Sequence, residues 1–256
     1  MASDDNNLTY PGGKLRLYVE APLGAAARVE PDAAQAHYLL HVMRAKPGDR
    51  VNLFNGRDGE WVAVLAEATK RGCVLKCEAR LAAQDAVPDV WLVFAPVKKT
   101  PADYVTQKAT ELGVCVLQPV LTRRTIVRRV NEERMRANAI EAAEQSGRLS
   151  VPEVRAPLAL EKLLAQWPRE RRILFCDEAG EAPPIAQALA GAPAAQGQEQ
   201  WAVLIGPEGG FDPAERALIR GQEFVTPVSL GTRILRADTA GLAALAVWQA
   251  LRGDWR

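Results

Sequence analysis

Cysteine and histidine are scarce in this chain. The sequence contains four cysteines, and no two of them have Cys-x-x-Cys spacing: Cys73, Cys77, Cys115 and Cys176. With His37 and His41 as the only histidines, this set argues against a disulfide framework and against a metal site. Because free cysteine is often buried, we expect Cys73 and Cys77 to be buried, in a reduced and cytoplasmic protein.

Long apolar runs and a basic leader are also absent. The first residues, MASDDNN, contain neither a positively charged nor an apolar stretch, and no run of uncharged apolar residues reaches the length of a membrane span. These absences exclude a secretory signal peptide and a transmembrane helix, so no membrane partner is expected. Residues 1–13 are predicted to be disordered.

Three widespread motifs and a large net charge are missing as well. The patterns GxxxxGK[S/T], GxGxxG and GxSxG do not occur. ATP hydrolysis, Rossmann dinucleotide binding and serine hydrolase chemistry therefore lose their usual support. The formal net charge is only +1, so a nucleic-acid partner would have to be bound by a local basic patch.

The patterns that are present indicate two domains. The chain has 256 residues, of which 48% are apolar, enough for two cores. Residues 15–81 contain short strand patterns with glycine-rich turns, which predict a small β-barrel, and residues 31–43 predict a short helix within it. Residues 82–88 (AAQDAVP) indicate a linker, which assigns residues 1–84 to the first domain and residues 85–256 to the second.

After residue 88, strand patterns alternate with helix patterns, which predicts an α/β domain with a parallel sheet. Two turns each follow a strand pattern and precede a helix: residues 205–211 (IGPEGGF) and residues 230–240 (LGTRILRADTA). Such turns lie at the carboxyl edge of a sheet, where ligands bind, and they expose backbone N–H groups. A glycine-rich turn is also often only a turn, so the pattern alone leaves both interpretations open.

An arginine cluster lies between a strand pattern that ends at Leu121 and a predicted helix that Asn131 can cap. Its members are Arg123, Arg124, Arg128 and Arg129, continued by Arg134 and Arg136. Planar guanidinium groups in a loop at the carboxyl end of a strand favour a phosphate-binding patch. The alternative is a solvated charged face.

The two glycine-containing turns, in this order, resemble the RsmE family of SPOUT-class methyltransferases, which methylate N3 of a uridine in small-subunit ribosomal RNA. Shorter stretches extend the resemblance over nearly the whole chain: residues 37–39 (HYL), 42–44 (VMR), 48–49 (GD), 108–113 (KATELG), 144–148 (EQSGR) and 151–152 (VP). The two long motifs together are specific, whereas any single one is not.

The resemblance implies an α/β fold with an N-terminal PUA-like β-barrel and a C-terminal parallel-sheet SPOUT domain that contains a deep trefoil knot. It also implies a homodimer and S-adenosylmethionine bound by the loops at residues 176–180, 205–210 and 230–235. The expected cofactor-binding residues are Cys176, Ile205, Gly206, Pro207, Gly209, Gly210, Leu230, Gly231, Ile234 and Leu235.

The resemblance further suggests which side chains act on the base. Arg236 stays protonated, so it could stabilise the negative charge that loss of the N3 proton places on uracil. Glu208 is the candidate base, and its alternative role is that of a turn carboxylate bonded to nearby N–H groups. The family commonly has RTETA where this chain has RADTA, so its acid, Asp238, is one methylene shorter. We expect Asp238 to cap the last helix, the alternative being that it reaches the substrate.

RNA binding is expected to be shared by the two domains. The predicted contacts are Arg16, His37, Arg44, Lys46, Lys98, Lys99, Arg123, Arg124 and Arg128. The partner would be 16S ribosomal RNA or the small ribosomal subunit. A second hypothesis is a non-catalytic RNA-binding or ribosome-assembly protein with a degenerate methyltransferase fold, which only the altered pair Ala237 and Asp238 supports.

Overall fold

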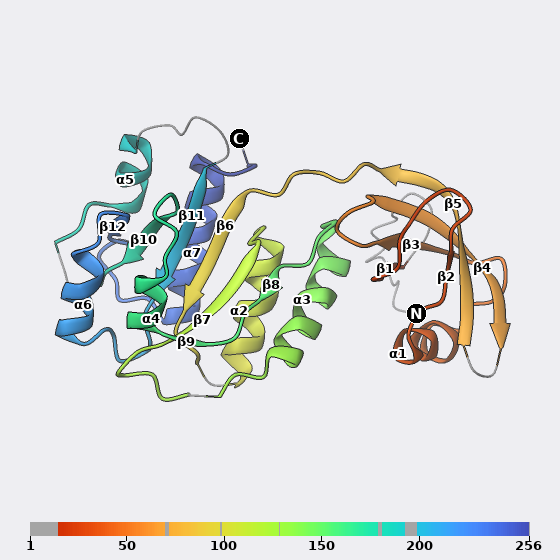
Figure 1. The fold of residues 1–256 in the computed structure, drawn as a ribbon, viewed down its shortest axis with the longest axis horizontal. Coiled ribbons are helices and arrows are strands. Elements are labelled where there is room, and N and C mark those ends of the chain that lie inside the picture. The colour runs from red at the N-terminus through yellow and green to blue at the C-terminus, as the bar shows by residue number, and fades with distance from the viewer. Residues whose placement is uncertain are drawn as a thin grey trace, which may run out of the picture. The chain divides into compact units, whose positions relative to one another are not determined.

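The chain folds into two compact units (Figure 1). The computed structural model describes residues 15–69, 72–97, 99–127, 129–178, 181–192 and 199–255, without the side chains of residues 99–101. The first unit consists of Met1–Ala86 and Ala143–Ser150, and the second of Val87–Ala142 and Val151–Arg256. The sequence led us to expect one boundary near residue 84, and the distant segment Ala143–Ser150 was not expected in the first unit. The predicted disorder of residues 1–13 lies outside the described residues.

Five strands form the sheet of the first unit, in the order β1-β3-β4-β5-β2. They are β1 (Arg16–Tyr18), β2 (Arg28–Val29), β3 (Arg50–Phe54), β4 (Glu60–Thr69) and β5 (Gly72–Ala82). β1 runs parallel to β3, and the other pairs are antiparallel. Register shifts between β4 and β5 mark bulges, which bend and twist a strand.

The buried cluster of this unit follows from strand alternation. Side chains two positions apart share a face, so Val51 and Leu53 of β3 enter the same cluster, together with Leu75 of β5. Cys73 and Cys77 are also part of it, which confirms their predicted burial. All four cysteines of the chain are free.

A short helical segment packs on this sheet. Asp32 caps α1 (Ala33–His37) by accepting the N–H of Gln35, whose side chain in turn accepts the N–H of Asp32. The chain then continues as one π-helical turn, η1 (Tyr38–Val42). The sequence predicted a single helix over residues 31–43. In the structure the second half of this helix is a wider π-helical turn, in which the N–H of Met43 donates to the carbonyl of Tyr38 over 2.9 Å.

The second unit is built on a seven-stranded sheet in the order β12-β10-β11-β6-β7-β8, with β9 also paired to β7. All its pairs are parallel, as the alternation of strand and helix patterns predicted. The strands are β6 (Asp89–Phe94), β7 (Val116–Leu121), β8 (Glu153–Val154), β9 (Leu158–Ala159), β10 (Arg172–Cys176), β11 (Gln200–Ile205) and β12 (Val225–Val228).

In the described residues, six helices accompany these strands, five between strands and one after the last strand. They are α2 (Lys99–Glu111), α3 (Glu132–Ser146), α4 (Leu160–Ala165), α5 (Ile185–Gly191), α6 (Pro213–Arg220) and α7 (Ala237–Leu251). Among the helices in the described parts of the chain, none is long and apolar enough to cross a membrane. Within the same residues, no group of three or more histidine, cysteine and acidic side chains is placed to hold a metal ion.

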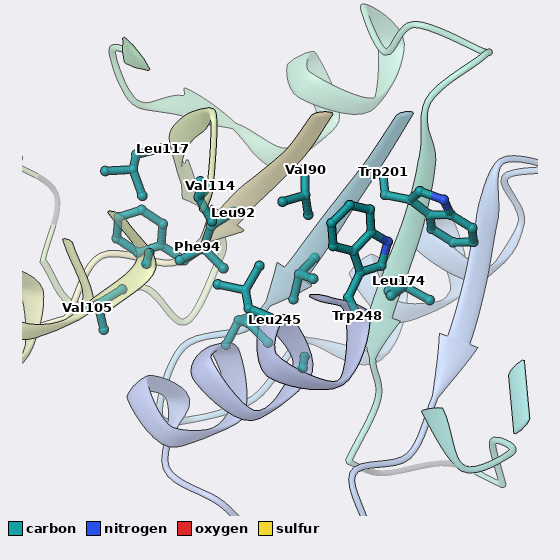
Figure 2. Packing of buried hydrophobic residues seen from close by; sticks show 14 of the residues in the cluster. Val90, Leu92, Phe94, Val105, Val114, Leu117, Leu174, Trp201, Leu245 and Trp248 are labelled. Carbon is teal, nitrogen blue, oxygen red and sulfur yellow. The ribbon is translucent and has the colours of Figure 1, made fainter. Parts of the chain in front are cut away.

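The parallel sheet is buried on both faces, so its strands are apolar at successive positions. Leu92 of β6 belongs to the cluster that contains α7, whereas the next residue, Val93, belongs to the cluster that contains α4 and α6. On the α7 side, Leu245 and Trp248 lie against Val90 and Leu92 (Figure 2). Packing on both faces holds the strand ends in fixed positions, and the loops that follow them start from a rigid edge.

Candidate functional site

The carboxyl ends of β10, β11 and β12 open onto one pocket. β10 lies between the other two, with Phe175 paired to Leu204 and Cys176 paired to Val228. The loops that follow the three strands therefore leave the sheet side by side. They line a pocket of about 380 Å³, which is within the size range of small-molecule sites.

Every residue that the sequence assigned to the cofactor lines this pocket. They are Cys176, Ile205, Gly206, Pro207, Gly209, Gly210, Leu230, Gly231, Ile234 and Leu235. The two proposed catalytic residues, Glu208 and Arg236, line it as well, and both are exposed. The structure thus brings together residues that lie up to sixty positions apart in the chain, as Cys176 and Arg236 do.

Two glycines of the glycine-rich turn lie close against neighbouring side chains. The N–H of Gly210 donates to the carbonyl of Pro207 over 2.8 Å, and Gly210 has a φ of +66°, in the region that favours glycine. A Cβ on Gly210 would lie 2.6 Å from Oε1 of Glu178, and one on Gly206 would lie 2.6 Å from the ring of Phe211. Glycine at these positions lets other groups approach the backbone closely.

A buried carboxylate lines the pocket. Asp177 directly follows β10, and its side chain is only 2% exposed. It accepts hydrogen bonds from Nε of Arg216, over 2.8 and 2.9 Å, and from Nε of Arg220 over 2.7 Å. Burial acts to raise the pKa of Asp177, but the hydrogen bonds and charges of both arginines outweigh it, so the pKa is lowered. Next to it, burial raises the pKa of the Cys176 thiol to about 12, which keeps this residue neutral.

Asp177, Glu178 and Arg216 also line the pocket. Asp177 and Glu178 lie within the expected cofactor loop 176–180, but sequence reasoning named none of the three as a site residue. One signal was available, because Asp177 and Glu178 directly follow a buried strand pattern at the predicted carboxyl edge. A second was the spacing of Arg216 and Arg220, which are one turn apart on α6 and therefore share a face.

Arg123 and Arg124 occupy a tight turn beside the pocket. The N–H of Thr125 donates to the carbonyl of Thr122 over 3.1 Å, and the N–H of Thr122 donates to Oγ1 of Thr125 over 2.9 Å. Both threonines are buried, whereas both arginines are exposed. Arg124 also lines the pocket. Of the other predicted RNA contacts nearby, Lys98 and Arg128 lie outside the described residues, and Lys99 is the first residue of α2.

The prediction that Arg16 contacts RNA is wrong for this structure, because its side chain is only 1% exposed. Its Nε donates to Glu60 over 2.7 Å, and Nη1 and Nη2 donate to carbonyls of the segment Ala143–Ser150. Burial and these bonds leave no surface for a phosphate. The other predicted contacts of the first unit, His37, Arg44 and Lys46, are exposed.

The prediction that Asp238 caps the last helix is also wrong. Arg236 takes the N-cap position, with extended backbone angles of φ −64° and ψ 155°, and makes no capping hydrogen bond with its side chain. Asp238 is the second residue of α7, and its Oδ1 accepts the N–H of Thr239 over 2.7 Å. An acid in the first turn still interacts favourably with the helix dipole.

A pocket at the carboxyl edge of a parallel sheet, beside a rigid turn of two exposed arginines, fits the class of nucleic-acid-modifying enzymes. Comparison with known families makes this specific. Residues 84–249 match the family model of the RNA methyltransferase domain, and residues 31–77 match that of the RNA methyltransferase PUA domain. The first match covers well over half of the chain. The chain therefore belongs to the RNA methyltransferase family.

Individual relatives agree with this assignment. The chain is 35% identical to ribosomal RNA small subunit methyltransferase E of Synechocystis sp., over 92% of this chain and 77% of the relative. It is 28% identical to the protein of that name from Rickettsia conorii, over 90% and 93%. The crystal structure of the Neisseria gonorrhoeae methyltransferase E, bound to S-adenosyl methionine, superposes with a TM-score of 0.84 at 28% identity, over 94% of this chain and 99% of that one.

Proposed function

We propose that this protein transfers a methyl group from S-adenosylmethionine to N3 of a uridine in small-subunit ribosomal RNA. The observation that carries the proposal is the convergence of three loops, far apart in the sequence, on one pocket at the carboxyl edge of the sheet. The relatives named as small-subunit ribosomal RNA methyltransferases, and the Neisseria protein with its bound S-adenosyl methionine, support the same reading.

The pocket suits this cofactor in size and in the chemistry of its walls. Ile205, Leu230 and Leu235 offer apolar surface for an adenine ring, and the backbone of the glycine-rich turn offers polar groups. Glu178 and Glu208 place carboxylates at a ligand that carries a sulfonium and an ammonium group. When bound, S-adenosylmethionine supplies a methyl group that the sulfonium charge has already activated.

The residues of the chain then have to align the uracil base and remove the proton from its N3 atom. Alignment of two reactants can lower a barrier by roughly 7–11 kcal/mol in the best intramolecular cases. Arg236, exposed at the pocket wall, donates hydrogen bonds to the uracil oxygens that become negative when N3 loses its proton. In this proposal Glu208, which lines the same pocket, accepts that proton.

RNA reaches the pocket along two exposed basic surfaces in this proposal. The turn with Arg123 and Arg124 lies beside the pocket, and His37, Arg44 and Lys46 lie on the surface of the first unit. The proposal also takes from the family resemblance a homodimer, a trefoil knot in the second unit and a cytoplasmic location. Asp238 offers little support for a non-catalytic assembly protein, because its carboxylate is engaged at the start of α7.

The test is transfer of labelled methyl groups to small ribosomal subunits, and to their naked RNA, from cells that lack this protein. We expect one uridine to be labelled. Arg236→Ala should slow transfer by about 10²- to 10³-fold, as loss of one charge-stabilising donor does, and should leave S-adenosylmethionine binding unchanged.

Arg169→Ala is the matched control for this test. Arg169 is exposed in the turn before β10, at the opposite edge of the sheet, and the substitution removes the same charge. Transfer at the wild-type rate by Arg236→Ala would refute the role of that residue. Failure of calorimetry to detect S-adenosylmethionine binding to the wild-type protein would instead favour the non-catalytic alternative.

A further inference from the structure

The turn that presents Arg123 and Arg124 is fastened to the glycine-rich turn at two points. The first is a backbone contact, in which the N–H of Arg123 donates to Oε1 of Glu215 over 2.7 Å. Glu215 is only 2% exposed, and its Oε2 accepts the N–H of Asp212, at the end of the glycine-rich loop, over 3.1 Å. One buried carboxylate therefore holds both loops.

The second point is the side chain of Arg124. Its Nη1 donates to the carbonyl of Gly209 over 2.9 Å. A Cβ built on Gly209 would lie 3.7 and 3.8 Å from Cβ and Cδ of Arg124, so the aliphatic stem of the arginine lies along this residue. Gly209 is followed by Gly210, whose N–H closes the turn onto Pro207. Arg124 thus holds the peptide that fixes the shape of the turn.

Arg124 has hydrogen-bond donors that this contact does not use. A guanidinium carries five N–H donors in a planar fork, and within the described part of the chain only Nη1 of Arg124 has a hydrogen-bond partner. The side chain is exposed, and Nε and Nη2 form an edge that matches two oxygens of a phosphate. One guanidinium can therefore hold the glycine-rich turn and an RNA phosphate at the same time.

We infer that Arg124 is a positioning residue that couples RNA binding to cofactor binding. The inference rests on the proposed function of the pocket. A phosphate on the outer edge of Arg124 fixes the rotamer that holds Gly209, and the ordered turn then binds the cofactor more tightly. Coupling of this kind is reciprocal, so a bound cofactor also tightens RNA binding.

The neighbouring arginine provides a matched comparison. Arg123 lies in the same turn and is also exposed, but its Nη1 pairs with Asp212 over 3.0 Å, and its side chain makes no hydrogen bond to residues 205–211 in the described structure. Arg123→Ala and Arg124→Ala remove the same charge from the same loop. Both should weaken RNA binding, whereas only Arg124→Ala should act on the cofactor.

The first measurement is calorimetry of S-adenosylmethionine with the full-length protein in the absence of RNA. Arg124→Ala should weaken binding about three- to tenfold, the range for net loss of one hydrogen bond, and Arg123→Ala should leave it unchanged. The second repeats the titration with S-adenosylhomocysteine, which cannot react, with and without small ribosomal subunits from cells that lack this protein. Subunits should tighten binding to the wild type and to Arg123→Ala, and not to Arg124→Ala.

Arg124→Lys tests the fork geometry, because lysine keeps the charge but is a single point donor. It should recover RNA affinity and not the coupling. Equal S-adenosylmethionine affinities of Arg124→Ala and Arg123→Ala, in folded proteins with equal melting temperatures, would overturn the inference, as would full coupling in Arg124→Lys. Absence of S-adenosylmethionine binding to the wild type would count against the proposed function itself, so the two failures are distinguishable.

Discussion

At the scale of single residues, one buried charge at the pocket is fixed by two ion pairs. Asp177 lines the pocket, and its carboxylate is held by Arg216 and Arg220. These bonds orient α6 against the end of β10. Because the carboxylate is nearly inaccessible to water, it cannot exchange its arginine partners for solvent, and the loss of its charge affects the folded state directly.

Asp177→Asn should therefore lower the free energy of unfolding by about 2 kcal/mol at pH 7. This cost is smaller than that of breaking a fully buried ion pair, because both arginine side chains are about one-third exposed. The pKa of Asp177 is lowered by folding, so its stabilisation is complete above the unfolded pKa of about 3.9 and is lost as pH falls through the folded pKa. The difference between wild type and variant in urea unfolding should close in acid. The exposed Asp85→Asn is the control, and a pH-independent difference would contradict this account.

At the scale of elements, the end of α3 is held by the first unit. Helices leave their last carbonyls without partners, and Nη1 of Arg16 bonds those of Ala143 and Glu144 over 2.8 and 3.0 Å. Nη2 bonds the carbonyl of Arg148 over 3.0 Å, and the guanidinium lies over the ring of Phe54. One side chain thus binds several carbonyls of the segment Ala143–Ser150, which belongs to the same unit.

Arg16→Ala should destabilise the first unit by about 3–5 kcal/mol, the range for removing one partner of a buried pair, because Glu60 and three carbonyls lose their donor. The matched control is Arg50→Ala, whose pair with Glu78 is 60% and 39% exposed and should contribute about 0–1 kcal/mol. Chemical unfolding and hydrogen exchange at residues 143–150 measure both. Equal, small effects of the two substitutions would show that Arg16 does not hold the segment.

Local sequence patterns predicted the elements that local forces determine. Asp212, Pro213 and Glu215 have the local pattern of a helix start, and the structure has the capping box there, at the start of α6. The N-cap of α7 lies two residues before the expected Asp238, at Arg236, which has an extended conformation and no capping side chain. The π-helical turn η1 was also missed, because residues 31–43 were expected to form one helix.

Interactions between distant residues account for the remaining differences. An arginine such as Arg16 is a residue type that often contacts RNA. Its structural role is visible only from its bonds to carbonyls that lie 127 to 132 positions away in the chain. Asp177 meets arginines 39 and 43 positions further on. By contrast, the pocket residues were predicted correctly as neighbours, because parallel strands bring their carboxyl ends to one edge and the family motifs mark the loops that follow.

At the scale of the whole molecule, a net charge of +1 means that RNA affinity must come from local basic patches. Each arginine or lysine that contacts a phosphate of single-stranded RNA adds about 0.7 to the slope of log affinity against log salt.

Arg44→Ala with Lys46→Ala, in the first unit, should therefore reduce the slope by about 1.4, and Arg124→Ala, in the second, by about 0.7. Arg169→Ala should leave it unchanged. Titration of 16S transcripts at several potassium chloride concentrations measures the slope. A change on substitution in only one unit would mean that RNA binds that unit alone, because a charge that contacts no phosphate releases no counterion.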